Sequence, residues 1–301
     1  NFGTKISGSY IKTNSLNLES AAATKIVNVG AGISVSSKAQ FGGAASVAWQ
    51  TYDSTLNSTI GGTSEISANQ VINNSLNFVK AYNIAGGIEA SFGKKGNSGG
   101  IALAYSNANT SITSSIDGAN IHLHDLTGTN PTAADVVGVR ITNTAQNKAD
   151  INTVGFNLAV SQNNNYSGVV ALNRITNNVS ASIGGSDSVL PYGEDDTSNF
   201  SVNKFGTIFS GVQSLVNSAT DNSNLLTIDL SAPLGGGNAY GGGVAYTSIG
   251  DGTHTNTNNA TQRVTASINK TMLGMLSDGT VTNRAEDNSK TVTIGIGVAL
   301  G

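Results

Sequence analysis

One arrangement of strands and turns recurs along this chain of 301 residues. Each copy begins with an alternating strand, continues with a Gly followed by an aliphatic strand, and reaches an Ile followed by small or polar residues. The period varies between about 55 and 75 residues while the strand pattern persists, which is typical of a regular scaffold that carries loop insertions. The first-strand markers are Ile33, Ile88, Phe156, Ile228 and Ile294, and the glycine markers are Gly43, Gly100, Gly168 and Gly243.

The repeat divides the chain into units at residues 27–85, 86–153, 154–225 and 226–291, and a fifth unit at residues 292–301 breaks off. The first residue is Asn rather than Met. We therefore expect residues 1–301 to form a single segment of a longer repetitive protein, in which each unit contacts only its neighbours.

Apolar residues alternate with Ser, Thr, Asn or Gly inside each predicted strand, as in Ile33-Ser34-Val35-Ser36. This period of two indicates strands with one buried and one exposed face. The alternating runs predict short strands of about 4–7 residues. We expect an all-β fold, a parallel β-solenoid with extruded loops, in which a unit of about 67 residues makes roughly three coils of about 22 residues.

An outer-membrane β-barrel built from antiparallel hairpins also alternates polar and apolar residues. Such barrels need two girdles of aromatic residues, whereas only 6% of this chain is aromatic. Many outward positions of a barrel would also hold Ala, Ser or Gly. The residue supply therefore favours the solenoid, and the barrel stays as an alternative.

Composition narrows the range of partners. Charged residues make up 11% of the chain and the formal net charge is -3, without the basic stripe that nucleic-acid binding needs. No apolar run approaches the length of a transmembrane helix. Cysteine is absent, which is common in bacterial proteins that cross an envelope unfolded and argues against a disulfide-stapled secreted domain.

Two stretches of the repeat resemble a known family: the segment from Gly168 to Ile183 (GVVALNRITNNVSASI) and the run from Val244-Ala245-Tyr246 to Val264–Ile268. They resemble the units of fusobacterial leukotoxin-like adhesins, which are large surface proteins of the filamentous haemagglutinin type. The resemblance covers nearly the whole chain, although its motif is degenerate. It implies a right-handed parallel β-helix, the central part of a passenger exported by type V secretion, either autotransport or two-partner secretion.

The resemblance also implies a function. It suggests a structural and adhesive segment, secreted or exposed on the cell surface of a Gram-negative bacterium, that mediates attachment to host cells or other bacteria. The expected partners are a surface receptor, either protein or glycan, and an outer-membrane secretion partner. The alternative is a leukotoxin-like cytotoxin passenger that acts on host membranes, so contact with a membrane is left open.

We expect no enzymatic activity and no cofactor. The third alternative is a glycan-active β-helix enzyme, which would place several carboxylates on neighbouring coils of one face. Charges in this chain are sparse and do not recur in register, so this alternative is not favoured.

His122 and His124 are separated by one residue, so strand alternation would point both imidazoles to one face. A metal site there is conceivable. The only other histidine is His254, and no third or fourth ligand is evident. A solvated strand face is therefore the favoured interpretation.

Glu194, Asp195 and Asp196 follow Gly193 and provide carboxylates that calcium could use. Their spacing matches neither an EF-hand nor a nonapeptide calcium repeat. A solvated loop is therefore favoured, and we predict no metal site in the chain.

Three predicted loop insertions, at residues 126–135, 187–198 and 250–259, offer the expected contact surfaces. Trp49 follows the aliphatic strand of the first unit and is either a binding anchor or a residue that packs a loop onto the scaffold. The predicted contact residues are Asn130, Glu194, Asp195, Asp196, His254 and Trp49.

Overall fold

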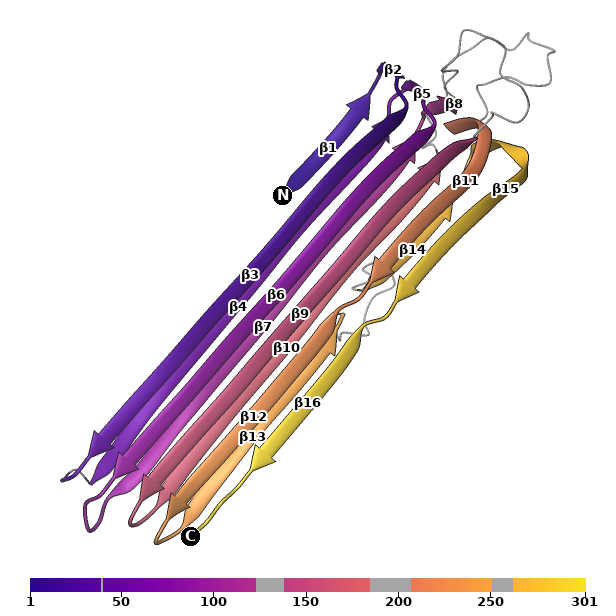
Figure 1. Ribbon diagram of the computed structural model, residues 1–301. Coiled ribbons are helices and arrows are strands. Elements are labelled where there is room, and N and C mark those ends of the chain that lie inside the picture. Colours follow the sequence, from indigo (N-terminus) through magenta and orange to yellow (C-terminus); the bar gives the residue numbers. More distant parts are fainter. Residues whose placement is uncertain (39, 123–137, 185–206, 251–261) are drawn as a thin grey trace, which may run out of the picture.

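The computed structural model describes residues 1–38, 40–122, 138–184, 207–250 and 262–301, and every regular element in these ranges is a strand (Figure 1). The all-β prediction is confirmed. The strands are β1 (Phe2–Ser7), β2 (Tyr10–Lys12), β3 (Ser15–Ser36), β4 (Phe41–Gly61), β5 (Glu65–Ser67), β6 (Gln70–Ser91), β7 (Asn97–Asp117), β8 (Asn120–His122), β9 (Val139–Ser161), β10 (Asn165–Gly184), β11 (Thr207–Asp221), β12 (Asn224–Gly235), β13 (Ala239–Ile249), β14 (Arg263–Ile268), β15 (Thr271–Asp287) and β16 (Lys290–Gly297).

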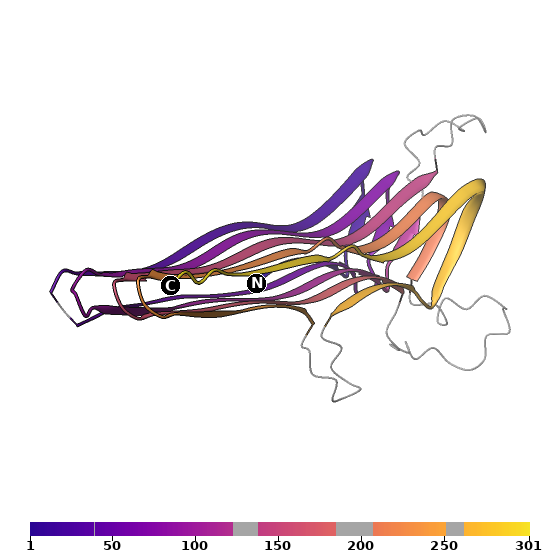
Figure 2. The same ribbon diagram turned by 90° about the horizontal axis from the view of Figure 1, so that it is seen from below.

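The strands form two sheets that lie face to face (Figures 1 and 2). Sheet A runs β1-β4-β7-β10-β13, with β14 also paired to β10, and sheet B contains the other ten strands. Each long strand is followed in sequence by a strand of the opposite sheet and pairs in parallel with a strand of the next repeat unit. The predicted parallel pairing is thus confirmed, and neither sheet closes on itself.

The strands are much longer than predicted. The six from β3 to β10 that carry the main ladders have 20 to 23 residues each, whereas the sequence predicted about 4–7. Each unit therefore supplies one long strand to each sheet, and the expected three coils per unit are wrong. The polar stretches between the alternating runs continue the strands, because their inward Asn and Ser side chains find hydrogen-bond partners between the sheets.

The repeat markers hold in part. The isoleucines Ile60, Ile116, Ile183 and Ile268 lie in one row across sheet A, as the repeat predicted. Phe156, in contrast, pairs with Gly86 rather than with the marker Ile88. The turn at residues 162–164 is shorter than the turn at residues 92–96. The number of residues that separates a position in sheet B from its counterpart in sheet A therefore changes from one unit to the next.

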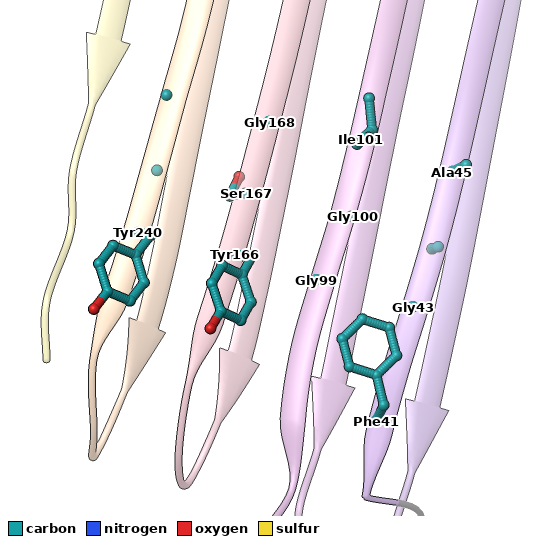
Figure 3. A pocket seen from close by; sticks show the side chains of 13 residues that line it. Phe41, Gly43, Ala45, Gly99, Gly100, Ile101, Tyr166, Ser167, Gly168 and Tyr240 are labelled. Carbon is teal, nitrogen blue, oxygen red and sulfur yellow. The ribbon is translucent and has the colours of Figure 1, made fainter.

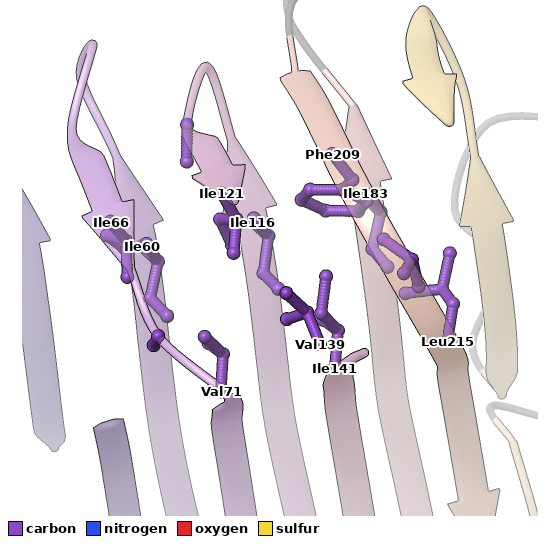
Figure 4. Close-up of a cluster of buried hydrophobic side chains, with 13 residues drawn as sticks. Ile60, Ile66, Val71, Ile116, Ile121, Val139, Ile141, Ile183, Phe209 and Leu215 are labelled. Carbon is purple, nitrogen blue, oxygen red and sulfur yellow. The ribbon is translucent and has the colours of Figure 1, made fainter. Parts of the chain in front are cut away.

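The two sheets are closer together at one end than at the other (Figure 2). We call the half with the turns at residues 92–96, 162–164 and 236–238 the narrow end, and the half with β2, β5 and β8 the wide end. Large apolar side chains fill the wide end, including Ile60, Ile66, Ile116, Ile121 and Phe209, all fully buried (Figure 4). This is the main hydrophobic core.

Small residues permit the close approach at the narrow end. Gly32 of β3 lies against the backbone of β4, where an added Cβ would be 2.6 Å from the carbonyl oxygen of Ala45. Gly30 faces the carbonyl oxygen of Val47 in the same way. Since real Cβ atoms do not approach an oxygen so closely, only glycine fits at these positions without separating the sheets.

A row of asparagines joins four consecutive strands of sheet B inside the molecule. The side-chain amide of Asn73 donates to the amide oxygen of Asn143, Asn143 donates to Asn217, and Asn217 donates to Asn283, each over 2.8 Å. These neighbours are 70, 74 and 66 residues apart in the chain. Stacked amides of this kind satisfy one another and fix the register of neighbouring strands.

Candidate functional site

Aromatic side chains gather on the outward face of sheet A at the narrow end. Trp49 on β4 stacks on Tyr105 on β7, with ring centroids 4.1 Å apart, and Trp49 remains 60% exposed. The parallel register continues this row through Leu172 on β10 to Tyr246 on β13. One strand position per unit therefore builds a row of large side chains across the sheet, which we call the tryptophan row.

A second row lies closer to the turns. Tyr166 on β10 and Tyr240 on β13 are direct neighbours in the register, and their rings are nearly parallel with centroids 5.5 Å apart. Figure 3 shows the two rings side by side with their hydroxyl groups toward the turns, and Phe41 of β4 beyond the strand that carries Gly99. We call Phe41, Tyr166 and Tyr240 the tyrosine row.

A shallow groove of about 750 Å³ lies beside the tyrosine row. Glycine keeps its floor low, because an added Cβ on Gly43 would be 2.9 Å from the ring of Phe41, and one on Gly99 would be 3.3 Å from the Cβ of Tyr166. The groove is lined by Phe41, Gly43, Ala44, Ala45, Gly99, Gly100, Ile101, Tyr166, Ser167, Gly168, Tyr240, Gly241 and Gly242.

No charged side chain lines this groove. Its exposed polar groups are the phenol hydroxyls, since the Ser167 hydroxyl points inward and donates to the backbone oxygen of Asn157. Flat aromatic faces beside a glycine floor suit apolar groups or the faces of sugar rings better than charged ligands.

A buried carboxyl group lies behind the groove. Glu89 of β6 is fully buried between the sheets, and an added Cβ on Gly100 would be 2.7 Å from its Oε2. Among the described residues, neither carboxylate oxygen has a hydrogen-bond partner. Asn157 lies near the same carboxyl group, since both side chains come close to the position of an added Cβ on Gly87. Its side-chain amide also has no hydrogen-bond partner among the described residues. The interior behind the aromatic face is therefore polar and incompletely satisfied.

The sequence-predicted residues are placed as follows. Trp49 is exposed at one end of the tryptophan row, where it stacks on Tyr105. His122 is partly exposed at the wide end, where β8 pairs with Ser67 and Ser210 of the neighbouring strands. The three predicted loops lie outside the described ranges, apart from Gly250. The remaining predicted residues also lie outside them: His124, Asn130, Glu194, Asp195, Asp196 and His254.

Within the described ranges, no three His, Cys, Asp or Glu residues form a group that could hold a metal ion. The same ranges contain no helix with the length and apolar character needed to cross a membrane.

The sequence pattern did not identify the tyrosine row. Phe41 and Tyr166 each precede a marker glycine by two residues, and Tyr240 precedes Gly243 by a run of glycines. This recurrence was a usable signal, but only the pairing register shows that the tyrosines are neighbours. No protein-family model, curated protein or solved structure matches this chain.

Proposed function

We propose that the chain is a structural and adhesive segment of a bacterial filamentous adhesin, exposed at the cell surface, through which the parent protein attaches to host cells or other bacteria. We further propose that the two sheets are the walls of a flattened, right-handed parallel β-solenoid. The observation that carries the proposal is the exposed aromatic face on a ladder of parallel strands. Exposed aromatic clusters of this kind commonly mark interaction sites.

The ladder suits a rigid spacer. Each repeat unit adds one strand to each sheet, and neighbouring strands share long continuous pairings, such as β6 with β9 over Gln70 to Ser91. In such an array each unit covers the edge of the one before it, so the length grows without a change in cross-section.

The aromatic face suits adhesion because it repeats with the ladder. Trp49, Tyr105 and Tyr246 come from three different units, and each further unit of this type would add another position to the row. Weak contacts that repeat along a stiff support can act together, which raises the overall strength of attachment.

The test compares attachment of beads coated with the chain to host cells and to bacteria. Replacing Trp49, Tyr166 and Tyr240 together by Ala should reduce attachment at least roughly ten-fold if these side chains are the anchors. The matched control replaces Asn57, Thr113 and Ser182 by Ala, which lie in outward positions of the wide end. Circular dichroism verifies that both variants fold.

Two results would contradict the proposal. Unchanged attachment of the aromatic variant would remove the aromatic face from the adhesive contact. An unmodified chain that attaches to neither host cells nor bacteria would remove the adhesive role itself.

A further inference from the structure

The polarity of the strands reverses halfway along their length. In the wide half of β7, Ile112 and Ile116 are fully buried and Thr113 faces outward. In the narrow half of the same strand, Ile101 faces outward and is 61% exposed, whereas Ser106 points inward and is buried. The wide end is a conventional protein interior, whereas the narrow end exposes most of its large apolar side chains and buries mainly small residues and polar groups.

The reversal affects both sheets. On sheet B the outward positions of the narrow end carry large aliphatic residues that solvent reaches, among them Val27, Val29, Ile33, Val35, Ile294 and Ile296, which are 40% to 74% exposed. No outward position of the narrow end carries a charge in the described strand segments 27–35, 41–49, 82–90, 99–105, 152–160, 166–172, 226–234, 240–246 and 292–300. We call this outward surface of both sheets the apolar sheath.

The borders of the apolar sheath differ from its centre. On sheet A the tryptophan row bounds it toward the wide end and the tyrosine row bounds it toward the turns, with Val, Leu, Ile, Ala and Gly between them. On sheet B the row directly beyond the sheath runs from Lys25 through Lys80, Asp150 and Asn224 to Lys290. The turns at the opposite border carry Lys38, Lys94 and Lys95.

The interior enclosed by the sheath holds a buried cluster of mostly small apolar residues, namely Ala48, Ala85, Ala102, Ala104 and Val169, together with buried polar groups. Asn83, Glu89, Asn157, Asp229 and Ser231 are buried there between the sheets. Several of their polar atoms have no hydrogen-bond partner, including both side-chain polar atoms of Asn157 and Oδ1 of Asp229. Large apolar side chains outside, around an interior of small residues and buried polar groups, depart from the usual arrangement of a water-soluble protein and suit a surface that lipid covers.

We propose that the apolar sheath inserts into the hydrocarbon layer of a lipid bilayer. Eight residue steps from Val27 to Val35 extend the sheath over about 26 Å, close to the roughly 30 Å of hydrocarbon in a bilayer. Aromatic rings and lysines at both borders are the groups that settle at the membrane–water interfaces. A second copy of the chain would cover one face and leave the opposite face in water, whereas lipid covers both.

Insertion also requires that the backbone groups at the sheet edges be hydrogen-bonded. Within the described residues, the narrow halves of β3 and β4 are unpaired on one side, and β13 and β16 are unpaired on the other. Unpaired backbone groups are not tolerated in hydrocarbon. Insertion therefore requires that these edges be covered, by a neighbouring repeat unit or by another chain.

Trp49 provides the test because it is the only tryptophan in the chain and lies at a border of the sheath. With protein-free phosphatidylcholine vesicles, its emission should shift to shorter wavelength. Lipids brominated near the headgroup should quench it more strongly than lipids brominated near the chain ends, since Trp49 lies at the border and not at the centre.

Charge substitutions separate the sheath from the rest of the surface. Ile33→Lys on sheet B and Ile101→Lys on sheet A should each reduce the lipid-bound fraction by roughly ten-fold or more, because a lysine at the centre of the hydrocarbon layer is costly. Both positions are exposed in water, so the variants should fold. Thr113→Lys, on the same strand and face as Ile101 but in the wide half, is the matched control and should bind vesicles as the unmodified chain does.

The inference deepens the proposed adhesive function by naming lipid as what its aromatic face contacts, and the outcomes keep the two apart. Attachment to cells without binding to protein-free vesicles would overturn lipid insertion and leave adhesion standing. A shift of Trp49 emission that follows protein concentration without lipid would show that a second copy covers the face, and would also overturn insertion. Vesicle binding without attachment to cells or bacteria would support insertion and contradict only the adhesive function.

Discussion

The side-chain amide of Asn143 donates to the amide oxygen of Asn217 over 2.8 Å, although 74 residues of chain separate them. Asn143 also accepts from Asn73 and from the hydroxyl of Ser114, and donates to the backbone oxygen of Ser182. One buried side chain therefore connects three strands of sheet B with two strands of sheet A, and ties the register of three repeat units together.

Asn143→Ala should lower the free energy of unfolding by about 3 kcal/mol or more, because it leaves several buried donors and acceptors without partners. Urea denaturation followed by circular dichroism measures the loss. Asn109→Ala is the control, since Asn109 is exposed and donates to Asp53 at the surface. A comparable loss in both variants would mean that the interior amide row contributes nothing beyond a surface hydrogen bond.

Ile116→Ala should cost about 2–5 kcal/mol, since it opens a cavity among the fully buried side chains of the wide end. Ile101→Ala changes the same residue type on the same strand, but at a position that is 61% exposed. In water this second variant should stay within about 0.5 kcal/mol of the unmodified chain. Equal costs would contradict the assignment of the core to the wide end.

Gly32→Ala should destabilise the chain by about 1–3 kcal/mol, because the new methyl group would lie too close to the carbonyl oxygen of Ala45 and would push the sheets apart. Gly295→Ala should be neutral or slightly stabilising, by less than about 1 kcal/mol, since nothing lies within 4 Å of the position where its Cβ would stand. Thermal unfolding of the two variants compares them directly. A harmless Gly32→Ala would show that the narrow spacing of the sheets is not fixed by glycine.

Glu89→Gln should raise the free energy of unfolding at pH 8 by about 1 kcal/mol or more, because a buried carboxylate without hydrogen-bond partners is costly and the amide carries no charge. The control is Glu19→Gln, which should change stability little because Glu19 is exposed on β3. Urea midpoints at pH 8 give the comparison. If Glu89→Gln lowers the free energy of unfolding instead, the ionised carboxylate must make favourable interactions in the folded state that an amide cannot replace.

The sequence predicted part of the fold well. The alternation around Ile33 and Ile88 indicated strands, and the two residues do pair in parallel one unit apart. Ile60, Ile116 and Ile183 were placed in one row correctly. Strand length was underestimated because only the alternating apolar runs were counted as strands, whereas inward polar residues such as Asn143 have partners on neighbouring strands that keep them in the sheet.

The candidate site was harder to predict. Trp49 was singled out as a possible binding anchor, but its stacking partner Tyr105 lies 56 residues further along the chain. Tyr166 is likewise brought beside Tyr240 only by the pairing of β10 with β13. Counting aromatic residues over the whole chain also obscured their concentration at one end. The predicted loop contacts at Asn130, Glu194 and His254 stay predictions.

The sequence by itself determined that this chain forms strands in register, because the period-two alternation and the recurring isoleucines act locally and repeat. It did not determine which side of each alternation faces inward, since alternating apolar and polar residues look the same from either side. The spacing of the two sheets made that choice. At the wide end the gap accepts Ile116 and Phe209, whereas at the narrow end glycines such as Gly32 bring the backbones so close that little volume is left inside and most of the large apolar side chains point outward.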